Sequence, residues 1–441
     1  MLAVGLAIHA VVLRLHDREE GRLLTLSFAL HVAASIGLIL VYTYYYTEGG
    51  DMISYHVAAT PVADALRYDF GSLATEVTAL LLQREHRIPY DVLDGSSTGS
   101  MQAVAIWLAF LLGNSLFASA LLIAVCSYAS KVIALSALKR HTPREYHAEL
   151  RLGLLLSPSG VVWTSVLLKE PVVMVFVGPF LLSMSWLVEG RRFAPAIALA
   201  ILSGAGISLF KPYVLMALVA AAATWLLVAR GLRDGRRITI RPQYIALAAA
   251  LALTGFSGAS AVFPKLTLDS VGDSLAYQRR VAAEVEGGSN FSIEGEGVTR
   301  DSEKGRSFGE QLALAPLALV TALFRPFLFE ARKAMQLLNA LEMTWLLALF
   351  VQVLQRTGAR GALARVLASP VLSFCAVITL VLALGTGLST SNLGALSRYR
   401  APMMPFFLFL LLALRKPLLV TAPGTSAPSP ETRRRPLMSA S

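Results

Sequence analysis

Long apolar blocks constrain this chain more than any other feature of its sequence. A helix needs about 20 apolar residues to cross the hydrocarbon core of a bilayer, where each backbone polar group must find its partner within the segment. Blocks close to that length occur at residues 23–46, 115–138, 244–263 and 371–388. The sequence therefore predicts an all-α fold, a polytopic bundle of transmembrane helices.

The overall composition agrees with a membrane-embedded chain. Hydrophobic residues make up 55% of the 441 residues and charged residues only 15%, whereas a soluble chain carries roughly 25% charged residues. The two cysteines, Cys126 and Cys375, both lie inside apolar blocks. Neither a disulfide framework nor a thiolate metal site is therefore expected.

The hydrophobic pattern predicts about 11 spans, several of them short. Their approximate bounds are 1–13, 23–46, 115–138, 148–168, 171–189, 193–210, 212–230, 243–263, 334–354, 368–388 and 401–415. Lys and Arg gather in alternate connections, and short loops rich in these residues stay in the cytoplasm because their translocation is unfavourable. This pattern places the C-terminus in the cytoplasm and the N-terminus outside the plasma (inner) membrane.

The net charge of +11 follows from the same topology. Lys and Arg outnumber Asp and Glu in the segments placed inside, but not in the segments placed outside. The basic excess is therefore a signal of membrane orientation. No nucleic-acid partner is needed to explain it.

The predicted spans divide the chain into six regions. They are the first two spans (1–46), an outer loop with juxtamembrane helices (47–114), central transmembrane helices (115–263), a second outer loop (264–333), C-terminal transmembrane helices (334–416) and a disordered cytoplasmic tail (417–441). Residues 56–82 alternate between apolar and polar side chains at helical spacing, which predicts helices lying on the membrane. Residues 311–324 are apolar but too few to cross the bilayer, so they also predict a helix lying on the membrane. Residues 284–306 are Gly-rich, polar and acidic, which is typical of a flexible insert.

Charged residues at the outer ends of the spans form the candidate site, and the first group follows the second span. In the run GGDMISYH, a helix that begins near Asp51 places Tyr55 one turn further along the same face. Asp51 has two compatible interpretations: it caps this helix, or it accepts a proton from a hydroxyl. His56 is a second candidate base, because an unperturbed imidazole has a pKa of about 6.5.

A second group lies where SPSGVVWTS interrupts an apolar run before Lys169 and Glu170. Irregular backbone at membrane depth is tolerated where it lines an enclosed or hydrated cavity, so we expect a broken helical hairpin there. The alternative is that both residues are solvated interfacial charges. Lys211 stands alone between two apolar spans, so it either has an anionic partner or extends to lipid phosphate.

Two later groups complete the outer face. Arg325 and Glu330 lie in the aromatic run FRPFLFE, with a structural ion pair as the alternative to a binding role. The last outer loop, SNLGALSRYR, contributes the candidates Asn392, Arg398, Tyr399 and Arg400. A guanidinium group can bind two phosphate oxygens at once through two parallel N–H groups. Because the basic residues of all these groups fall at one membrane level, they predict a site for lipid-linked phosphate or pyrophosphate.

These features resemble the integral-membrane GT-C glycosyltransferases that use polyprenyl-phosphate sugars, and related bacterial envelope-polysaccharide proteins. The shared features are an acidic residue after an early span, amphipathic outer helices, the Pro…Trp-x-Ser…Lys-Glu stretch and the segment RYRAPMMP. The resemblance implies that Asp51 is the general base and that basic residues hold the lipid phosphate, namely Lys169, Arg398 and Arg400. Many members have two paired acidic residues at the first position, whereas here Asp51 stands alone beside Glu48.

The function implied by the resemblance is inverting transfer of a sugar from a polyprenyl-(pyro)phosphate donor to a glycan or lipid acceptor, with Tyr55 positioning the acceptor. An O-antigen or exopolysaccharide polymerase or ligase is the nearest alternative. A transporter or flippase and a non-catalytic scaffold are the others. Membrane lipids and other polysaccharide-assembly proteins are the expected partners. No cofactor is required by the motifs, and a divalent metal is left open.

Overall fold

The computed structural model describes residues 1–46, 50–93, 96–233, 291 and 313–417, and these residues form helices and no β-strand. The first helices are α1 (Leu2–Arg14), α2 (Arg18–Tyr44), α3 (Asp51–Tyr68), α4 (Phe70–Leu81), α5 (Ser97–Leu112), α6 (Leu116–Lys139), η1 (Arg144–Tyr146), α7 (His147–Leu156) and α8 (Pro158–Val162). They are followed by α9 (Lys169–Glu189), α10 (Phe193–Phe210), α11 (Pro212–Arg233), α15 (Ala315–Phe324), η2 (Leu328–Glu330), α16 (Ala334–Ala368), α17 (Pro370–Ser389), α18 (Leu393–Tyr399) and α19 (Met404–Arg415). The all-α prediction is confirmed for these residues.

Seven of the described helices are long and apolar enough to cross a membrane, and the chain is therefore a multi-pass membrane protein. They are α2, α6, α9, α10, α11, α16 and α17. The predicted count of about 11 is not confirmed. The expected span at 148–168 is interrupted between α7 and α8. The expected spans 1–13 and 401–415 form α1 and α19, which at 1.5 Å per residue are about 20 Å long or less, short of the roughly 30 Å core.

Other predicted elements lie outside the described residues. These are the span at 243–263, the insert at 284–306 and all but the first residue of the tail at 417–441. The helix expected within 311–324 is present as α15, and the helical spacing of 56–82 corresponds to α3 and α4.

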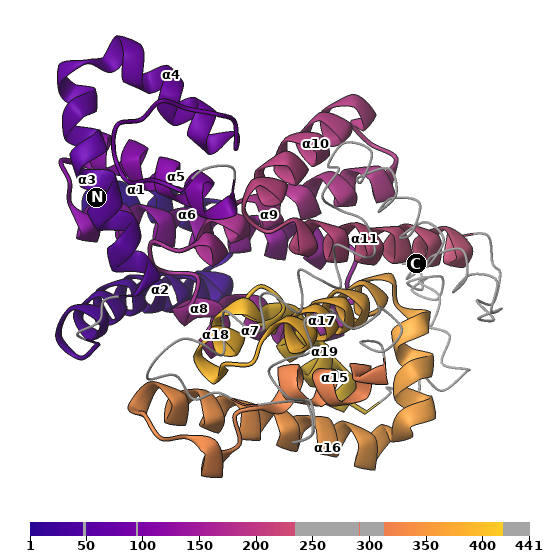
Figure 1. The fold of residues 1–441 in the computed structure, drawn as a ribbon. Helices are drawn as coiled ribbons and strands as arrows, with labels where there is room; N and C mark the ends of the chain where they lie inside the picture. The colour runs from indigo at the N-terminus through magenta and orange to yellow at the C-terminus, as the bar shows by residue number, and fades with distance from the viewer. Residues whose placement is uncertain (47–49, 94–95, 234–290, 292–312, 418–441) are drawn as a thin grey trace, which may run out of the picture.

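The region 47–114 contains one helix that the sequence analysis did not predict. Ser96 caps α5 by accepting a hydrogen bond from the Gly99 backbone N–H at 3.2 Å, and Gly113 ends the helix in a left-handed conformation with φ of 68°. Helix α5 packs against α3 and α4. It thereby holds α3, and with it Asp51, against the bundle (Figure 1).

The tightest packing in the bundle joins α6 to α9. The Ser130 hydroxyl donates to the Met174 carbonyl at 2.5 Å and accepts from the Gly178 N–H at 2.9 Å. A Cβ atom at Gly178 would overlap the Ser130 carbonyl oxygen. Small residues allow helix backbones to approach closely in membrane bundles, and this contact fixes the position of α9.

Two buried charged residues secure the break between α7 and α9. The Glu342 carboxylate accepts a hydrogen bond from the Ser159 N–H at 3.0 Å, near the start of α8. At the other end, Lys131 Nζ donates to the Gly160 carbonyl at 2.6 Å and to the Thr164 hydroxyl at 2.8 Å. A carboxylate at a helix N-terminus and a cation at its C-terminal carbonyls are both favourable. These contacts hold the irregular segment that leads into α9.

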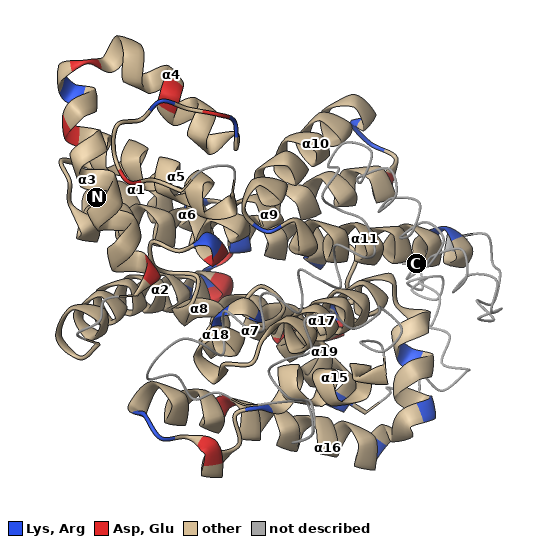
Figure 2. Cartoon of the chain, in the orientation of Figure 1, with Lys and Arg blue, Asp and Glu red and all other residues tan. Residues whose placement is uncertain are grey.

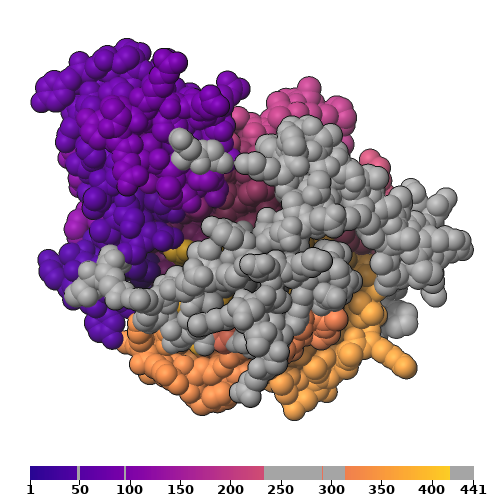
Figure 3. All heavy atoms as spheres, viewed as in Figure 1, coloured from indigo at the N-terminus to yellow at the C-terminus, as the bar shows by residue number. Residues whose placement is uncertain are grey.

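The C-terminal helices form the lower part of the molecule in Figure 1, where α16 is orange and α17 to α19 are yellow. The orange part of the chain also lies at the lower edge in Figure 3. Helix α16 is interrupted at Gly358, whose φ of 68° and ψ of 160° are not helical. Helix α17 packs against both α11 and α19, and α18 lies between the end of α17 and the start of α19. This arrangement brings α18 back toward the start of α9.

Candidate functional site

Four charged side chains from distant parts of the sequence meet near the start of α9. They form the ion cluster, which consists of Asp51, Glu170, Lys211 and Arg398. Figure 2 shows acidic and basic segments meeting close to this point, while most helix surfaces carry no charge. All four are candidate site residues predicted from the sequence, and the structure brings them together.

Glu170 is the centre of the ion cluster. Its Oε1 atom lies 2.7 Å from Lys211 Nζ and 3.4 Å from Arg398 Nε. Glu170 is only 2% exposed and Lys211 only 4%. An unpaired charge in such an environment would be strongly unfavourable. Lys211 therefore has the anionic partner that its position predicts, and the alternatives of a snorkelling Lys211 and a solvated Glu170 are wrong.

Arg398 connects this buried pair to the open edge of the cluster. Its Nη1 atom donates to Asp51 Oδ2 at 2.7 Å. The side chain of Arg398 is 18% exposed and that of Asp51 is 47% exposed. The cluster thus runs from a buried carboxylate, through one guanidinium group, to a carboxylate that a ligand can reach.

The start of α3 places Asp51 at this edge. Gly50, with φ of 128°, is the N-cap of α3, and Asp51 is the first residue of the helix. The alternative that Asp51 caps the helix is therefore wrong, although its charge still favours the positive helix N-terminus. On a helix with 3.6 residues per turn, His56 points about 140° away from Asp51. His56 is half-buried, which lowers its pKa, and it is not part of the ion cluster.

Aromatic side chains surround the two cations of the cluster. The Tyr399 ring lies 4.5 Å from Lys211 Nζ and 5.2 Å from Arg398 Cζ, within the range of cation–π attraction. The Tyr213 hydroxyl accepts a hydrogen bond from Lys211 at 3.0 Å. Tyr55 is buried on the same side of α3 as Asp51, and burial together with the negative charge of Asp51 raises its pKa.

The electrostatics of the cluster favour the charged forms of both cations. Burial alone would lower the pKa of Lys211, but the Glu170 carboxylate outweighs burial and raises it. Burial likewise opposes the charge on Arg398, whereas Asp51 and Glu170 hold its pKa above the ordinary value. Both cations therefore remain protonated at neutral pH.

Lys169 lies beside the cluster and contacts different partners. Its Nζ atom donates to the Ser97 hydroxyl at 3.1 Å and to the Thr98 hydroxyl at 2.8 Å, both in the first turn of α5. Ser97, Thr98 and Tyr213 were not among the residues predicted for the site. The run Ser-Ser-Thr-Gly before an apolar stretch is a helix-start signature and could have predicted α5, but not its contact with Lys169.

Several predicted site residues have structural roles elsewhere. Arg400 is fully buried, and its guanidinium group donates to Asn339 Oδ1 at 2.7 Å and to the Ala322 carbonyl at 3.2 Å. Its assignment to the phosphate site is wrong, because the side chain turns into the bundle. Asn392 caps α18 by accepting from the Gly394 N–H at 2.8 Å.

Arg325 and Glu330 pair with each other. Arg325 Nε lies 3.0 Å from Glu330 Oε1, and the guanidinium group lies over the Phe291 ring at 4.5 Å. Hydrogen bonds from Arg325 outweigh the effect of burial and lower the pKa of Glu330. The structural ion pair, the alternative interpretation of these residues, is the arrangement found.

The charge balance of the site favours an anionic ligand. Glu170 pairs with Lys211 and Asp51 pairs with Arg398, so the positive charge of Lys169 is in excess. A phosphate oxygen could replace the Asp51 carboxylate on Arg398, because guanidinium groups bind both acceptors in the same geometry. Within the described residues, no group of three or more His, Cys, Asp or Glu side chains is placed to hold a metal ion.

Comparisons with known proteins add no assignment to this geometry. A scan against protein-family models finds no match to the chain. Searches of curated proteins and of solved structures find no similar protein either.

Proposed function

We propose that the protein is a glycosyltransferase that moves a sugar from a polyprenyl-(pyro)phosphate donor to an acceptor hydroxyl. The supporting observation is that Arg398 joins the exposed carboxylate of Asp51 to the buried carboxylate of Glu170. Glu170 thus holds the guanidinium group of Arg398 on its buried side, and on its open side Arg398 contacts Asp51, which another anion could replace. Positive-inside topology supports a site on the outer face of a bacterial plasma membrane, in envelope-polysaccharide assembly.

Donor binding would separate the Asp51–Arg398 pair. The donor phosphate takes the place of Asp51 on Arg398, and Glu170 keeps the guanidinium group in position at 3.4 Å. Lys169, held by two hydroxyl groups of α5, supplies a second cation to the phosphate. Asp51 then becomes free to accept a proton.

Transfer follows by direct displacement. The acceptor oxygen attacks the anomeric carbon, the bond between that carbon and the phosphate oxygen breaks, and the electron pair leaves with the phosphate. Asp51 takes the proton from the acceptor hydroxyl, a contribution typically worth about 10²–10⁴-fold in rate. Arg398 and Lys169 stabilise the charge that develops on the phosphate.

The test of this proposal is the substitution Asp51→Asn, with Asp64→Asn as the matched control. Asp64 lies on the same helix and is also exposed, in a surface pair with Arg67. We expect Asp51→Asn to lower the rate of glycan formation by about 10²-fold or more while protein abundance stays unchanged. Asp64→Asn should leave the rate nearly unchanged. Equal activity of the two variants would remove Asp51 from the mechanism.

Lipid-linked intermediates separate transfer from polymerisation. In cells that lack the protein, an intermediate missing one sugar would support single transfer. Accumulation of single complete repeat units would instead support a polymerase or ligase at the same site.

A transporter is the second candidate, and the buried Lys131 and Glu342 beside the interrupted segment favour it, since transported polar substrates need polar groups within the bilayer. Movement of a labelled polyprenyl-phosphate sugar across vesicles that contain the purified protein, without any new glycosidic bond, would support transport over transfer.

A further inference from the structure

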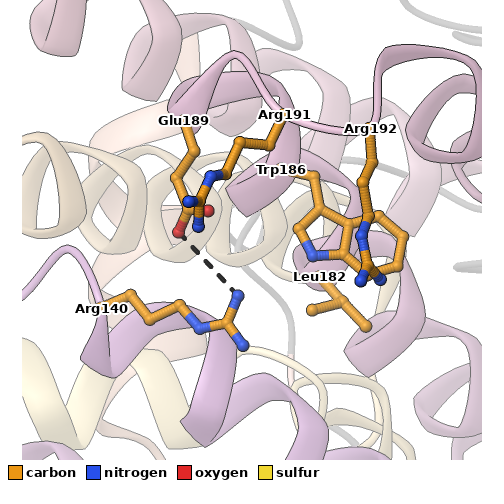
Figure 4. A pocket seen from close by; sticks show the side chains of 6 residues that line it. All are labelled: Arg140, Leu182, Trp186, Glu189, Arg191 and Arg192. Carbon is orange, nitrogen blue, oxygen red and sulfur yellow. Dashed lines mark ion pairs between the residues drawn. The ribbon is translucent and has the colours of Figure 1, made fainter.

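A second polar site lies at the opposite end of α9 and α10. A hollow of about 390 Å³ opens where α9 ends and α10 begins, beside the end of α6. This arginine hollow is lined by Arg140, Leu182, Trp186, Glu189, Arg191 and Arg192. Figure 4 shows Arg140, Glu189 and Arg191 turned toward one space, with Arg192 against Trp186.

The arginine hollow and the ion cluster lie on opposite faces of the membrane. Helix α9 begins at Lys169 and ends at Glu189, and it contains 21 residues. At 1.5 Å per residue this helix is about 30 Å long, which matches the hydrocarbon thickness of a bilayer. By the positive-inside pattern, the arginine hollow is at the cytoplasmic face.

The charges of the arginine hollow are not balanced. Its one carboxylate, Glu189, lies 3.9 Å from Arg140 Nη1 and 3.7 Å from His141 Nε2. Arg191 forms no ion pair with any described residue. Three guanidinium groups therefore face one carboxylate, and the excess of positive charge suits an anion that carries more than one oxygen acceptor.

The turn between α9 and α10 preorganises Arg192. Arg192 has φ of 50° and ψ of 47°, a left-handed conformation that a non-glycine residue adopts only at an energetic cost. This conformation accompanies a guanidinium group placed 5.2 Å from the Trp186 ring. Stacking on an indole fixes the plane of the guanidinium group and leaves its N–H edge free to bind oxygen atoms.

The hollow also has an apolar wall, formed by Leu182 and Trp186 near the end of α9. Leu182 and Trp186 lie one turn apart on α9, and both precede Arg191 and Arg192 in the chain, so they lie closer to the middle of the helix. Tryptophan is enriched at the membrane–water interface because its ring is apolar and its N–H is polar. A ligand with a phosphate group above and an apolar body below fits both parts.

We propose that the arginine hollow binds the phosphate of an anionic membrane lipid, with Arg191 and Arg192 as the main ligands. Basic pockets between transmembrane helices at the cytoplasmic face have the charge and the access that such headgroups need. Arg140 holds Glu189 away from the phosphate, and Trp186 contacts the glycerol and upper acyl region. This site is independent of the proposed transfer reaction.

The test compares lipids on the purified full chain in detergent by native mass spectrometry. We expect phosphatidylglycerol to remain bound about tenfold more than phosphatidylcholine, because both lipids carry a phosphate but the choline cation of phosphatidylcholine opposes its paired contact with guanidinium groups. The double variant Arg191→Ala/Arg192→Asn should lose this preference, since Asn tolerates the left-handed conformation. The control variant Arg356→Ala/Arg360→Ala removes two exposed arginines of α16 and should keep it.

Two results would overturn the proposal. One is a phosphatidylglycerol preference that is absent in the wild-type chain or unchanged in the double variant. The other is binding of inorganic phosphate at these arginines without any preference among lipids, which would make the ligand a soluble anion. If the double variant fails to fold, Arg191→Lys/Arg192→Lys keeps the charge but loses the paired contact and the stacking. Its preference should then fall below that of the wild type, and an unchanged preference would contradict the proposal.

Discussion

The two ends of α9 and α10 carry similar residues in opposite arrangements. At one end, the buried Lys211 and the half-buried Arg398 lie around Glu170, with each cation paired to a carboxylate. At the other end, Arg191 and Arg192 are exposed beside a hollow, and the one carboxylate among its described lining residues is engaged by Arg140 and His141.

The difference follows from the surroundings of each end. A buried cation has lost its water and must gain a carboxylate, so Lys211 and Glu170 form a closed pair at the back of the ion cluster. An exposed guanidinium group stays hydrated, so it needs no carboxylate partner in the absence of a ligand. The buried pair of Glu170 and Lys211 therefore fixes the geometry of the proposed reaction site. The exposed, unpaired positive charge of the arginine hollow makes that end suitable for binding an anion.

Removal of the central carboxylate should have the largest effect on stability. Glu170→Gln leaves Lys211 buried without its counter-ion, which we expect to lower the free energy of unfolding by about 3–5 kcal/mol. Chemical unfolding in mixed micelles would measure the change. The double variant Glu170→Gln/Lys211→Met should recover part of the loss, since it removes the unpaired cation as well. If the double variant were less stable than Glu170→Gln alone, the pairing would not be the source of the effect.

The aromatic surface of the cluster should contribute a smaller amount. Tyr399 lies over both Lys211 and Arg398, so Tyr399→Leu should lower the free energy of unfolding by about 0.5–2 kcal/mol. Tyr399→Phe keeps the ring and serves as the control, with little change expected. Similar losses in both variants would point to the hydroxyl group instead of the ring.

Removal of the Glu189 carboxylate in the arginine hollow should have the smallest effect on the free energy of unfolding. Glu189→Gln loses only long, partly exposed contacts to Arg140 and His141, so a change below about 1 kcal/mol is expected in the same unfolding measurement. The variant should also retain phosphatidylglycerol more strongly than the wild type, because a competing anion is gone. A loss as large as that of Glu170→Gln would show that the two ends do not differ in the way described.

The site was predictable in part because charged residues at span ends are conspicuous in an apolar chain. Asp51, Glu170, Lys211 and Arg398 stand out for that reason, and the structure joins them. Arg400 was equally conspicuous, yet it turns inward to Asn339. Arg398 lies in the short helix α18 and Arg400 is its C-cap two residues later, so at 100° per residue their side chains point about 160° apart, and membrane level alone could not separate their roles.

By itself, the sequence determined that the chain is an all-α membrane protein and that its exceptional charges lie at span ends. Hydropathy and helical periodicity are local properties, readable within about 20 residues. Only the tertiary structure decided which charges pair, because the partners are 41 residues apart for Glu170 and Lys211 and 347 apart for Asp51 and Arg398. The tertiary structure also placed the first turn of α5 against Lys169 and three arginines around one hollow. Burial sets the energy of a charge, and burial depends on the packing of the whole bundle.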